Sequence, residues 1–178
     1  MACVAILLAS QGAKAQRWAV QTNFMDYLSY GTLNIEGGIA VGRHWSANAV
    51  AKLNPYKLSK GGEPASARQM LYGAGVRYWP WHVYSGWWAG TRLQFQEYNI
   101  GGIKDESTTE GDRYGMGLSG GYSYMITPHL NVDIGAGFWV GWDKFTTYSC
   151  PVCGIKTDKG TKNFFLPNDL MLALVYVF

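Results

Sequence analysis

Apolar and polar residues alternate with a period of two along most of the chain. In the stretch NVDIGAGFWVGW, residues 131–142, Val132, Ile134 and Phe138 share one face, while Asp133 and several glycines share the other. The same alternation marks residues 18–24, 33–42, 46–54, 69–79, 87–96, 112–126 and 169–178. Because successive side chains of a β-strand point to opposite faces, the pattern predicts about eight strands and little helix.

The predicted connections between these strands alternate in length. Short turns fall near Arg43, Pro80 and Pro128, whereas long polar or glycine-rich links are predicted over residues 59–66, 99–111 and 144–161. The link over residues 27–31 is short, although it falls on the side of the long ones. Short turns at one rim and longer loops at the other are typical of bacterial outer-membrane barrels. The predicted fold is therefore all-β, an antiparallel eight-stranded transmembrane β-barrel of the outer membrane.

The polar face of the strands indicates which side of the barrel meets lipid. A soluble ligand carrier has an apolar interior, whereas a membrane barrel has the reverse. Glycine suits a narrow interior in which large neighbours must fit, and charges of both signs predict buried ion pairs. We expect Glu36 and Asp133 to accept from some of the basic side chains. The predicted interior network consists of Glu36, Lys52, Arg77, Arg92, Arg113 and Asp133.

Aromatic residues cluster beside the predicted short turns. Trp and Tyr gather at membrane interfaces, because one end of each ring system is apolar and the other forms hydrogen bonds. An ordinary aromatic core cluster is the alternative. The predicted periplasmic interface consists of Trp45, Trp79, Trp81, Trp87, Trp88, Tyr176 and Phe178. The last strand ends on an aromatic residue and resembles the signal that the outer-membrane insertion machinery recognises.

Composition and the N-terminal residues narrow the class of protein. Charged residues make up only 15% of the chain, aromatic residues another 15%, and there are 23 glycines. The formal charge of +3, without a basic aromatic cluster, argues against nucleic-acid binding. Residues 2–9 are apolar and precede Ala13-Lys14-Ala15, a small-x-small cleavage pattern. We therefore expect a signal peptide over residues 1–15 and the barrel over residues 16–178.

Residues that could carry chemistry are few. The three histidines, His44, His82 and His129, fall beside predicted short turns, away from the side where lipid-modifying barrel enzymes gather their catalytic groups. We therefore predict no catalytic residues, metal site or cofactor. Cys150 and Cys153 remain after signal cleavage, and an oxidising compartment favours a disulfide between them. A redox-active pair or half of a zinc site are the alternatives.

Four stretches carry a resemblance to a known family: TNFMDYLSYGTLNIEGGIAVGRHWS, KLNPYKL, GVRYWP and QFQEYNIGGI. Here the chain is similar to domain-of-unknown-function family 3575 of Bacteroidales. The resemblance implies an outer-membrane type of barrel, in some cases encoded near fimbria genes. It brings no catalytic residue with it.

The sequence thus predicts a small closed outer-membrane barrel with a structural or interaction role. Its expected partners are the lipid bilayer, the insertion machinery and a protein bound at the extracellular loops, in the setting of surface-fibre assembly. Two alternatives stay open: a soluble, lipocalin-like ligand carrier and an outer-membrane lipid-modifying enzyme. Eight strands leave an interior that side chains just fill, so we expect no open pore.

Overall fold

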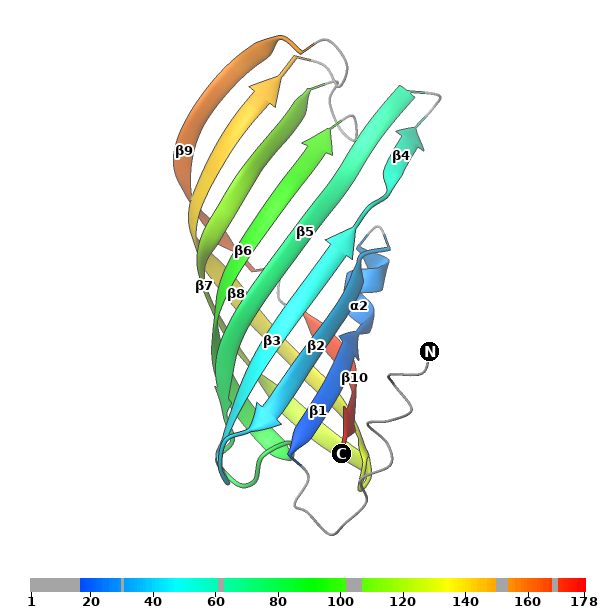
Figure 1. Ribbon diagram of the computed structural model, residues 1–178, viewed down its shortest axis with the longest axis vertical. Helices are drawn as coiled ribbons and strands as arrows, with labels where there is room; N and C mark the ends of the chain where they lie inside the picture. The colour runs from blue at the N-terminus through cyan, green and yellow to red at the C-terminus, as the bar shows by residue number, and fades with distance from the viewer. Residues whose placement is uncertain (1–16, 30, 61–62, 102–106, 150–153, 168–169) are drawn as a thin grey trace.

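The computed structural model describes residues 17–29, 31–60, 63–101, 107–149, 154–167 and 170–178. The predicted signal peptide, residues 1–15, and the predicted disulfide between Cys150 and Cys153 lie outside these ranges. The described residues form a tilted, strongly curved antiparallel sheet that closes on itself (Figure 1). In the described part of the chain, no helix is long and apolar enough to span a membrane.

The described residues form ten strands and one short helix. Their bounds are β1 Trp18–Asn23, α2 Phe24–Leu28, β2 Leu33–Ala40, β3 Trp45–Asn54, β4 Lys57–Lys60, β5 Glu63–Tyr78, β6 Gly86–Gly101, β7 Thr108–Thr127, β8 Leu130–Tyr148, β9 Lys156–Leu166 and β10 Met171–Val177.

The barrel closes through the pairing of β1 with β10. Each strand from β1 through β2, β3, β5, β6, β7 and β8 pairs with the next, and β10 completes the ring between β8 and β1. These are the eight strands that the alternation predicts. β4 adds to the side of β5, and β9 pairs with β8 beyond the end of β10. The closed antiparallel eight-stranded barrel is thus confirmed, with β9 as an extra strand.

β9 and β10 follow one another along the same side of β8. Leu166 at the end of β9 is opposite Trp139, and Met171 at the start of β10 is opposite Gly135. Pro167 lies between the two strands. Proline has no N–H to donate to a neighbouring strand, which accounts for the interruption at this point.

The helix α2 begins where β1 ends. The Asn23 side chain accepts a hydrogen bond from the Met25 N–H at 3.2 Å, as an N-cap residue does. The same side chain donates to the Leu170 carbonyl at 3.0 Å and accepts from the Leu172 N–H at 3.0 Å. Asn23 therefore ties the end of β1 to the start of β10 while it turns the chain into a helix that the strand pattern does not predict.

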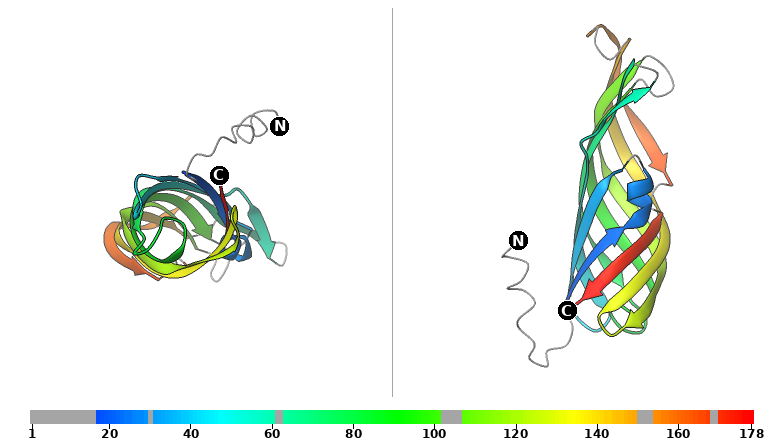
Figure 2. Two further views of the ribbon diagram at one scale, coloured as in Figure 1. Left: turned by 90° about the horizontal axis from the view of Figure 1, so that it is seen from below. Right: turned by 90° about the vertical axis from the view of Figure 1, so that its right-hand side faces the viewer.

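One wall of the barrel is much taller than the other. β7 has 20 residues and β8 has 19, whereas β1 has 6 and β2 has 8. The upper parts of β5 to β9 consequently rise as an open curved sheet above the closed barrel (Figure 2). We name this part the upper sheet; it comprises residues 63–70, 97–101, 108–113, 143–148 and 156–162.

The upper sheet corrects the prediction of three long loops. Most of the described residues in the segments predicted as links are paired strand, including residues 108–111, which pair with both β6 and β8. The sequence there is polar at successive positions, as in TTEGD. Without an apolar face the period-two signal disappears, although the β-branched threonines still favour extended backbone.

Inward-facing glycines let the strands approach large side chains. A Cβ atom at Gly135 would lie 2.8 Å from the Gly120 carbonyl oxygen and 3.0 Å from the Trp88 ring. The corresponding atom at Gly73 would lie 2.9 Å from Cδ of Arg92. At the outward-facing Gly37, a Cβ atom would meet nothing within 4 Å. The interior glycines thus make room for neighbours, as the sequence pattern predicts.

Replacing Gly135 with leucine should therefore destabilise the barrel by about 1–3 kcal/mol, the usual cost of overpacking. The matched variant is Gly37→Leu at an outward-facing, open position, which should change the free energy of unfolding by no more than about 0.5 kcal/mol. Urea unfolding of the refolded protein measures both. Equal stability of the two variants would place Gly135 at an open site.

Candidate functional site

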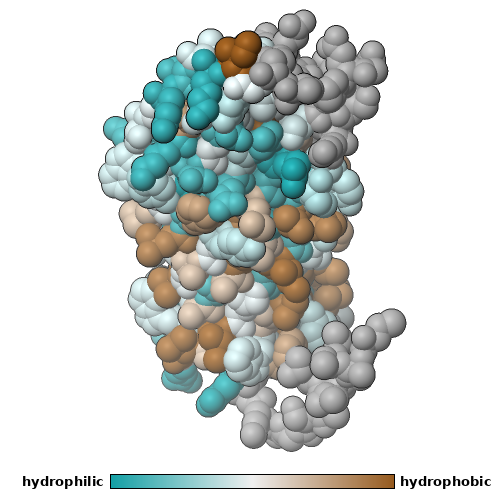
Figure 3. All heavy atoms as spheres, turned by 45° about the horizontal axis from the view of Figure 1, so that its top comes forward, coloured by the Kyte–Doolittle hydropathy of each residue, from teal (hydrophilic) through white to brown (hydrophobic). Residues whose placement is uncertain are grey.

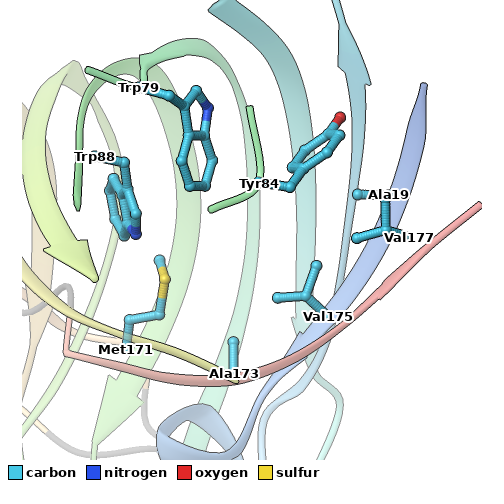
Figure 4. Close-up of a cluster of buried hydrophobic side chains, with 8 residues drawn as sticks. All are labelled: Ala19, Trp79, Tyr84, Trp88, Met171, Ala173, Val175 and Val177. Carbon is cyan, nitrogen blue, oxygen red and sulfur yellow. The ribbon is translucent and has the colours of Figure 1, made fainter. Parts of the chain in front are cut away.

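The turn end of the barrel is filled by an apolar cluster. Trp79 and Trp88 pack inside it with ring centroids 6.3 Å apart, and Tyr84 contacts Trp79 edge-on at 5.8 Å (Figure 4). The inward faces of β1 and β10 supply the rest of the cluster. Its buried members are Ala19, Trp79, Tyr84, Trp88, Met171, Ala173, Val175 and Val177.

This cluster corrects the prediction for two of the interface aromatics. Trp79 is 1% exposed and Trp88 is 3% exposed, so neither lies on the outer surface. The reason is their position in the alternation: Trp79 shares the parity of Arg77, and Trp88 shares the parity of Arg92. The Trp79 indole N–H donates to the Ser46 hydroxyl at 3.0 Å inside the barrel.

The turn between β5 and β6 folds into the barrel end. Tyr84 has a φ of +63°, a left-handed conformation that is rare for a residue with a side chain. Its carbonyl accepts hydrogen bonds from the Asn131 amide at 2.6 Å and the Ser123 hydroxyl at 3.4 Å, which hold the turn inward. Burial raises the pKa of the Tyr84 hydroxyl to about 12, so the ring stays neutral inside the cluster.

Above the apolar cluster lies a buried group of charged side chains. Arg77 contacts Glu36 at 2.6 Å and Asp133 at 3.3 Å, and Arg92 lies 3.8 Å from Glu36. All four residues are at most 6% exposed. Gln21 accepts a further bond from Arg77 at 3.2 Å. Two positive and two negative groups thus meet inside the barrel, which makes this group neutral overall.

A second ionic cluster lies higher in the barrel, around Asp143. This carboxylate is fully buried and accepts from the Tyr98 hydroxyl at 2.8 Å and from Nε of Arg113 at 3.1 Å. The Arg113 guanidinium also lies 3.9 Å from the centre of the Tyr98 ring. Lys162 of β9 approaches the same carboxylate at 3.8 Å, with a side chain that is 55% exposed.

The two clusters contain five of the six residues of the predicted network. Glu36, Arg77, Arg92 and Asp133 come together, whereas Arg113 pairs with Asp143. Asp143 was not among the predicted residues, although it continues the inward parity of Asp133 along β8.

Lys52 belongs to neither cluster and pairs with the helix α2. It pairs with Asp26 of α2 at 2.9 Å, and each side chain is 15% exposed. A cavity of about 10 Å³ lies beside them and beside Glu36 and Arg92. That volume is close to the minimum for one water molecule.

Exposed aromatic rings gather on the outer surface near the short turns. Trp45 packs against Tyr78 with the two rings tilted and their centroids 5.1 Å apart, and Trp87 meets Tyr122 edge-on at 5.2 Å. We name this group the lower aromatic band. Its exposed members are Trp18, Trp45, Tyr78, Trp81, Trp87, Tyr122, Tyr124 and Tyr176, and Phe178 is partly buried beside Tyr176.

A second aromatic row, which the sequence analysis did not single out, crosses the outer surface higher up. Tyr72, Phe95, Tyr114 and Trp142 are successive cross-strand partners on β5, β6, β7 and β8. We name this row the upper aromatic band. On β7 it lies eight positions from the lower band, from Tyr114 to Tyr122. At about 3.3 Å per residue and a tilt of about 40°, the two bands are roughly 20 Å apart.

Between the two bands the outward-facing side chains are apolar or small. Leu93 is 69% exposed and Ile134 is 59% exposed, in positions that water would penalise. The described outward positions of the closed barrel between the bands carry no charge. They are Val20, Thr22, Leu33, Ile35, Gly37, Ile39, Ala47, Ala49, Ala51, Leu53, Ala74, Val76, Ala89, Thr91, Leu93, Met116, Leu118, Gly120, Val132, Ile134, Ala136, Phe138, Val140, Leu172 and Leu174.

Charges return immediately above the upper aromatic band. The next outward row joins Glu97, Asp112 and Lys144 on β6, β7 and β8. Hydrophilic side chains cover the upper sheet, and a more hydrophobic zone lies beneath it on the face in Figure 3. The outer surface therefore has an uncharged belt, bounded by aromatic rings and then by charged residues.

The histidines occupy structural positions at the turns. Nδ1 of His44 lies 2.9 Å from the Trp79 carbonyl, and Nδ1 of His129 lies 2.9 Å from the Val177 carbonyl. His82 forms an isolated bridge with Ser85 within its turn. Within the described ranges, no three His, Cys, Asp or Glu side chains come together as a metal site requires.

Comparison with known proteins supports the sequence resemblance. No curated protein matches the chain. The family model described as "Protein of unknown function (DUF3575)" matches residues 1–178, the whole length of the chain. A small closed β-barrel with an ionic interior is thus the fold of this chain, which belongs to the DUF3575 family of proteins of unknown function.

Proposed function

We propose that the protein is an integral outer-membrane β-barrel with a structural or interaction role, exerted through the upper sheet. The observation that carries this proposal is the uncharged belt between the two aromatic bands. Its estimated height, roughly 20 Å, is close to the apolar band of about 25 Å found on outer-membrane barrels. Trp and Tyr at both edges are the side chains that membrane interfaces favour.

The interior favours this proposal over a soluble ligand carrier. A carrier of the lipocalin type needs an apolar cavity inside and a polar surface outside. Here the buried ion pairs of Arg77 and Arg113 occupy the interior, and large apolar side chains face outward. The aromatic cluster at the turn end fills the space through which a pore would open. We therefore propose a barrel that does not conduct.

The role proposed for the upper sheet is not catalytic. Strands of the outer-membrane class need about 9–11 residues to cross the bilayer, whereas β7 and β8 are almost twice as long. The surplus holds a rigid, charged sheet above the membrane, as a surface for a protein partner requires. Surface-fibre components, which the family resemblance suggests as partners, stay a prediction.

Cell fractionation tests the proposal. The full chain, expressed with its own N-terminal segment, should appear in the outer-membrane fraction and dissolve only with detergent. It should also migrate faster on a gel before boiling than after, because closed barrels resist unheated dodecyl sulfate. Release into the soluble periplasmic or secreted fraction would contradict the proposal and favour the soluble carrier.

A further inference from the structure

The free edge of β9 is the feature that the proposed function leaves unexplained. β9 stands at the end of the strand order, and within the described residues it pairs with β8 alone. Its other edge presents a row of backbone N–H and C=O groups over Lys156–Leu166. Such a row is a ready template for pairing with another extended chain.

The path of the chain shows where an added strand would lie. β1 occupies the corresponding edge of β10 as far as Asn23, which is opposite Ala173. At Phe24 the chain turns into α2 and leaves this track. A strand added to β9 would continue the line of β1 upward, in the position next to β9 that β1 does not reach (Figure 2).

The register places most of this edge above the proposed membrane. Trp142 of the upper aromatic band is opposite Asn163, so Lys156 to Lys162 lie on the charged side of that band. A partner in water can therefore reach them. This step rests on the proposed function, because it takes the belt to be the membrane-embedded part.

The charge of β9 indicates which partner it accepts. β9 carries three lysines and one acidic residue, Asp158. Lys162 lies 3.8 Å from the Asp143 carboxylate, whereas Lys156 and Lys159 are exposed. Lysines on an edge strand discourage pairing with a like-charged edge, which includes the β9 of a second copy. Lys156 and Lys159 attract an acidic segment, so the same two residues disfavour a second β9 and favour an acidic partner. We propose that the free edge of β9 binds an extended acidic segment of another protein by strand addition.

Peptide binding to the full chain in phosphatidylcholine nanodiscs tests this inference. The probe is a fluorescent nine-residue peptide of alternating glutamate and valine. Two control peptides carry either lysine in place of glutamate, or proline at alternate positions so that strand hydrogen bonds cannot form. The acidic peptide alone should bind, and it should slow amide hydrogen exchange specifically in β9.

Charge variants of the protein then locate the site. Lys156→Gln/Lys159→Gln should weaken binding of the acidic peptide roughly fivefold, as expected for losing two exposed ion pairs. Arg17→Gln/Arg43→Gln removes the same charge from two exposed residues at the opposite, turn end of the barrel and should leave the affinity unchanged.

Three results would overturn the inference. The first is that the lysine or proline peptide binds as tightly as the acidic peptide. The second is that the acidic peptide binds without slowing exchange of the β9 amides. The third is that β9 amides become protected as protein concentration rises without any peptide, which would show pairing between copies. A chain that assembles in nanodiscs but ignores the acidic peptide refutes the inference alone. A chain that cannot enter a bilayer refutes the proposed function as well.

Discussion

Replacing Arg77 with methionine should lower the free energy of unfolding by about 3–5 kcal/mol, the usual cost of leaving buried charges without a partner. Arg77 joins Glu36 and Asp133, which are 6% and 1% exposed. Methionine keeps much of the side-chain volume and removes only the charge and its hydrogen bonds. Urea unfolding of the protein refolded in lipid vesicles measures the difference.

The matched control is Arg68→Met, because Arg68 lies on the same strand and is exposed. It should change stability by less than about 0.5 kcal/mol. Combining Arg77→Met with Glu36→Gln should recover part of the loss, since each change then removes a partner of the other. If Arg77→Met is as stable as the control, water fills the interior, and conductance of single barrels would have to be measured.

Arginine in place of Ile134 should destabilise the assembled barrel by about 2–4 kcal/mol if the belt lies in the hydrocarbon region. Ile134 faces outward on β8 between the two aromatic bands and is 59% exposed. A charge at that position would have to lie in lipid, whereas on a soluble barrel it would be hydrated. The folded fraction after refolding into vesicles at increasing urea concentrations measures this loss of stability.

Thr161→Arg is the companion variant. Thr161 is exposed on β9 above the upper aromatic band. Lys144 is directly opposite and repels the new charge, but in water this repulsion should cost less than about 1 kcal/mol. Equal assembly of the Ile134→Arg and Thr161→Arg variants would mean that the belt does not face lipid.

The sequence predicts the inside and the outside of the barrel well because alternation is a local property of a strand. Asp133, Gly135 and Gly137 face inward, and Val132, Ile134 and Phe138 face outward, as their parity along β8 indicates. The same parity places Trp79 and Trp88 inside. The prediction that they lie at the membrane interface was wrong because it followed their closeness in sequence to other tryptophans and not their parity.

The pairing of charges is less accessible from sequence because it depends on the strand register. Lys52 and Arg113 lie on the polar face as predicted, yet their partners are Asp26 and Asp143. Asp26 reaches Lys52 because α2 folds over the barrel edge. A helix of five residues is too short to be predicted from hydrophobic periodicity. The face on which each residue lies can be predicted from its own strand, whereas its ion-pair partner is determined by how the strands align in the closed sheet.

The strands of the upper sheet could not be predicted from sequence for a different reason. Above the aromatic bands, successive positions such as Asp112 and Arg113 are both polar, so the strand has no apolar face to reveal it. Pairing with both neighbours keeps these residues extended. The break at Pro167 likewise separates β9 from β10 without ending the path along β8, which single-strand patterns cannot show.

Collisions of spin labels with oxygen and with a water-soluble nickel chelate, measured in reconstituted vesicles, test whether the belt faces lipid. One label replaces Leu93, which is 69% exposed within the belt, and another replaces Lys159 on the upper sheet, both in a chain carrying Cys150→Ser and Cys153→Ser. We expect oxygen to relax the label at position 93 more strongly than nickel does, with the reverse order at position 159. Stronger relaxation by nickel at both positions would show that water surrounds the belt, and would contradict a membrane-embedded barrel.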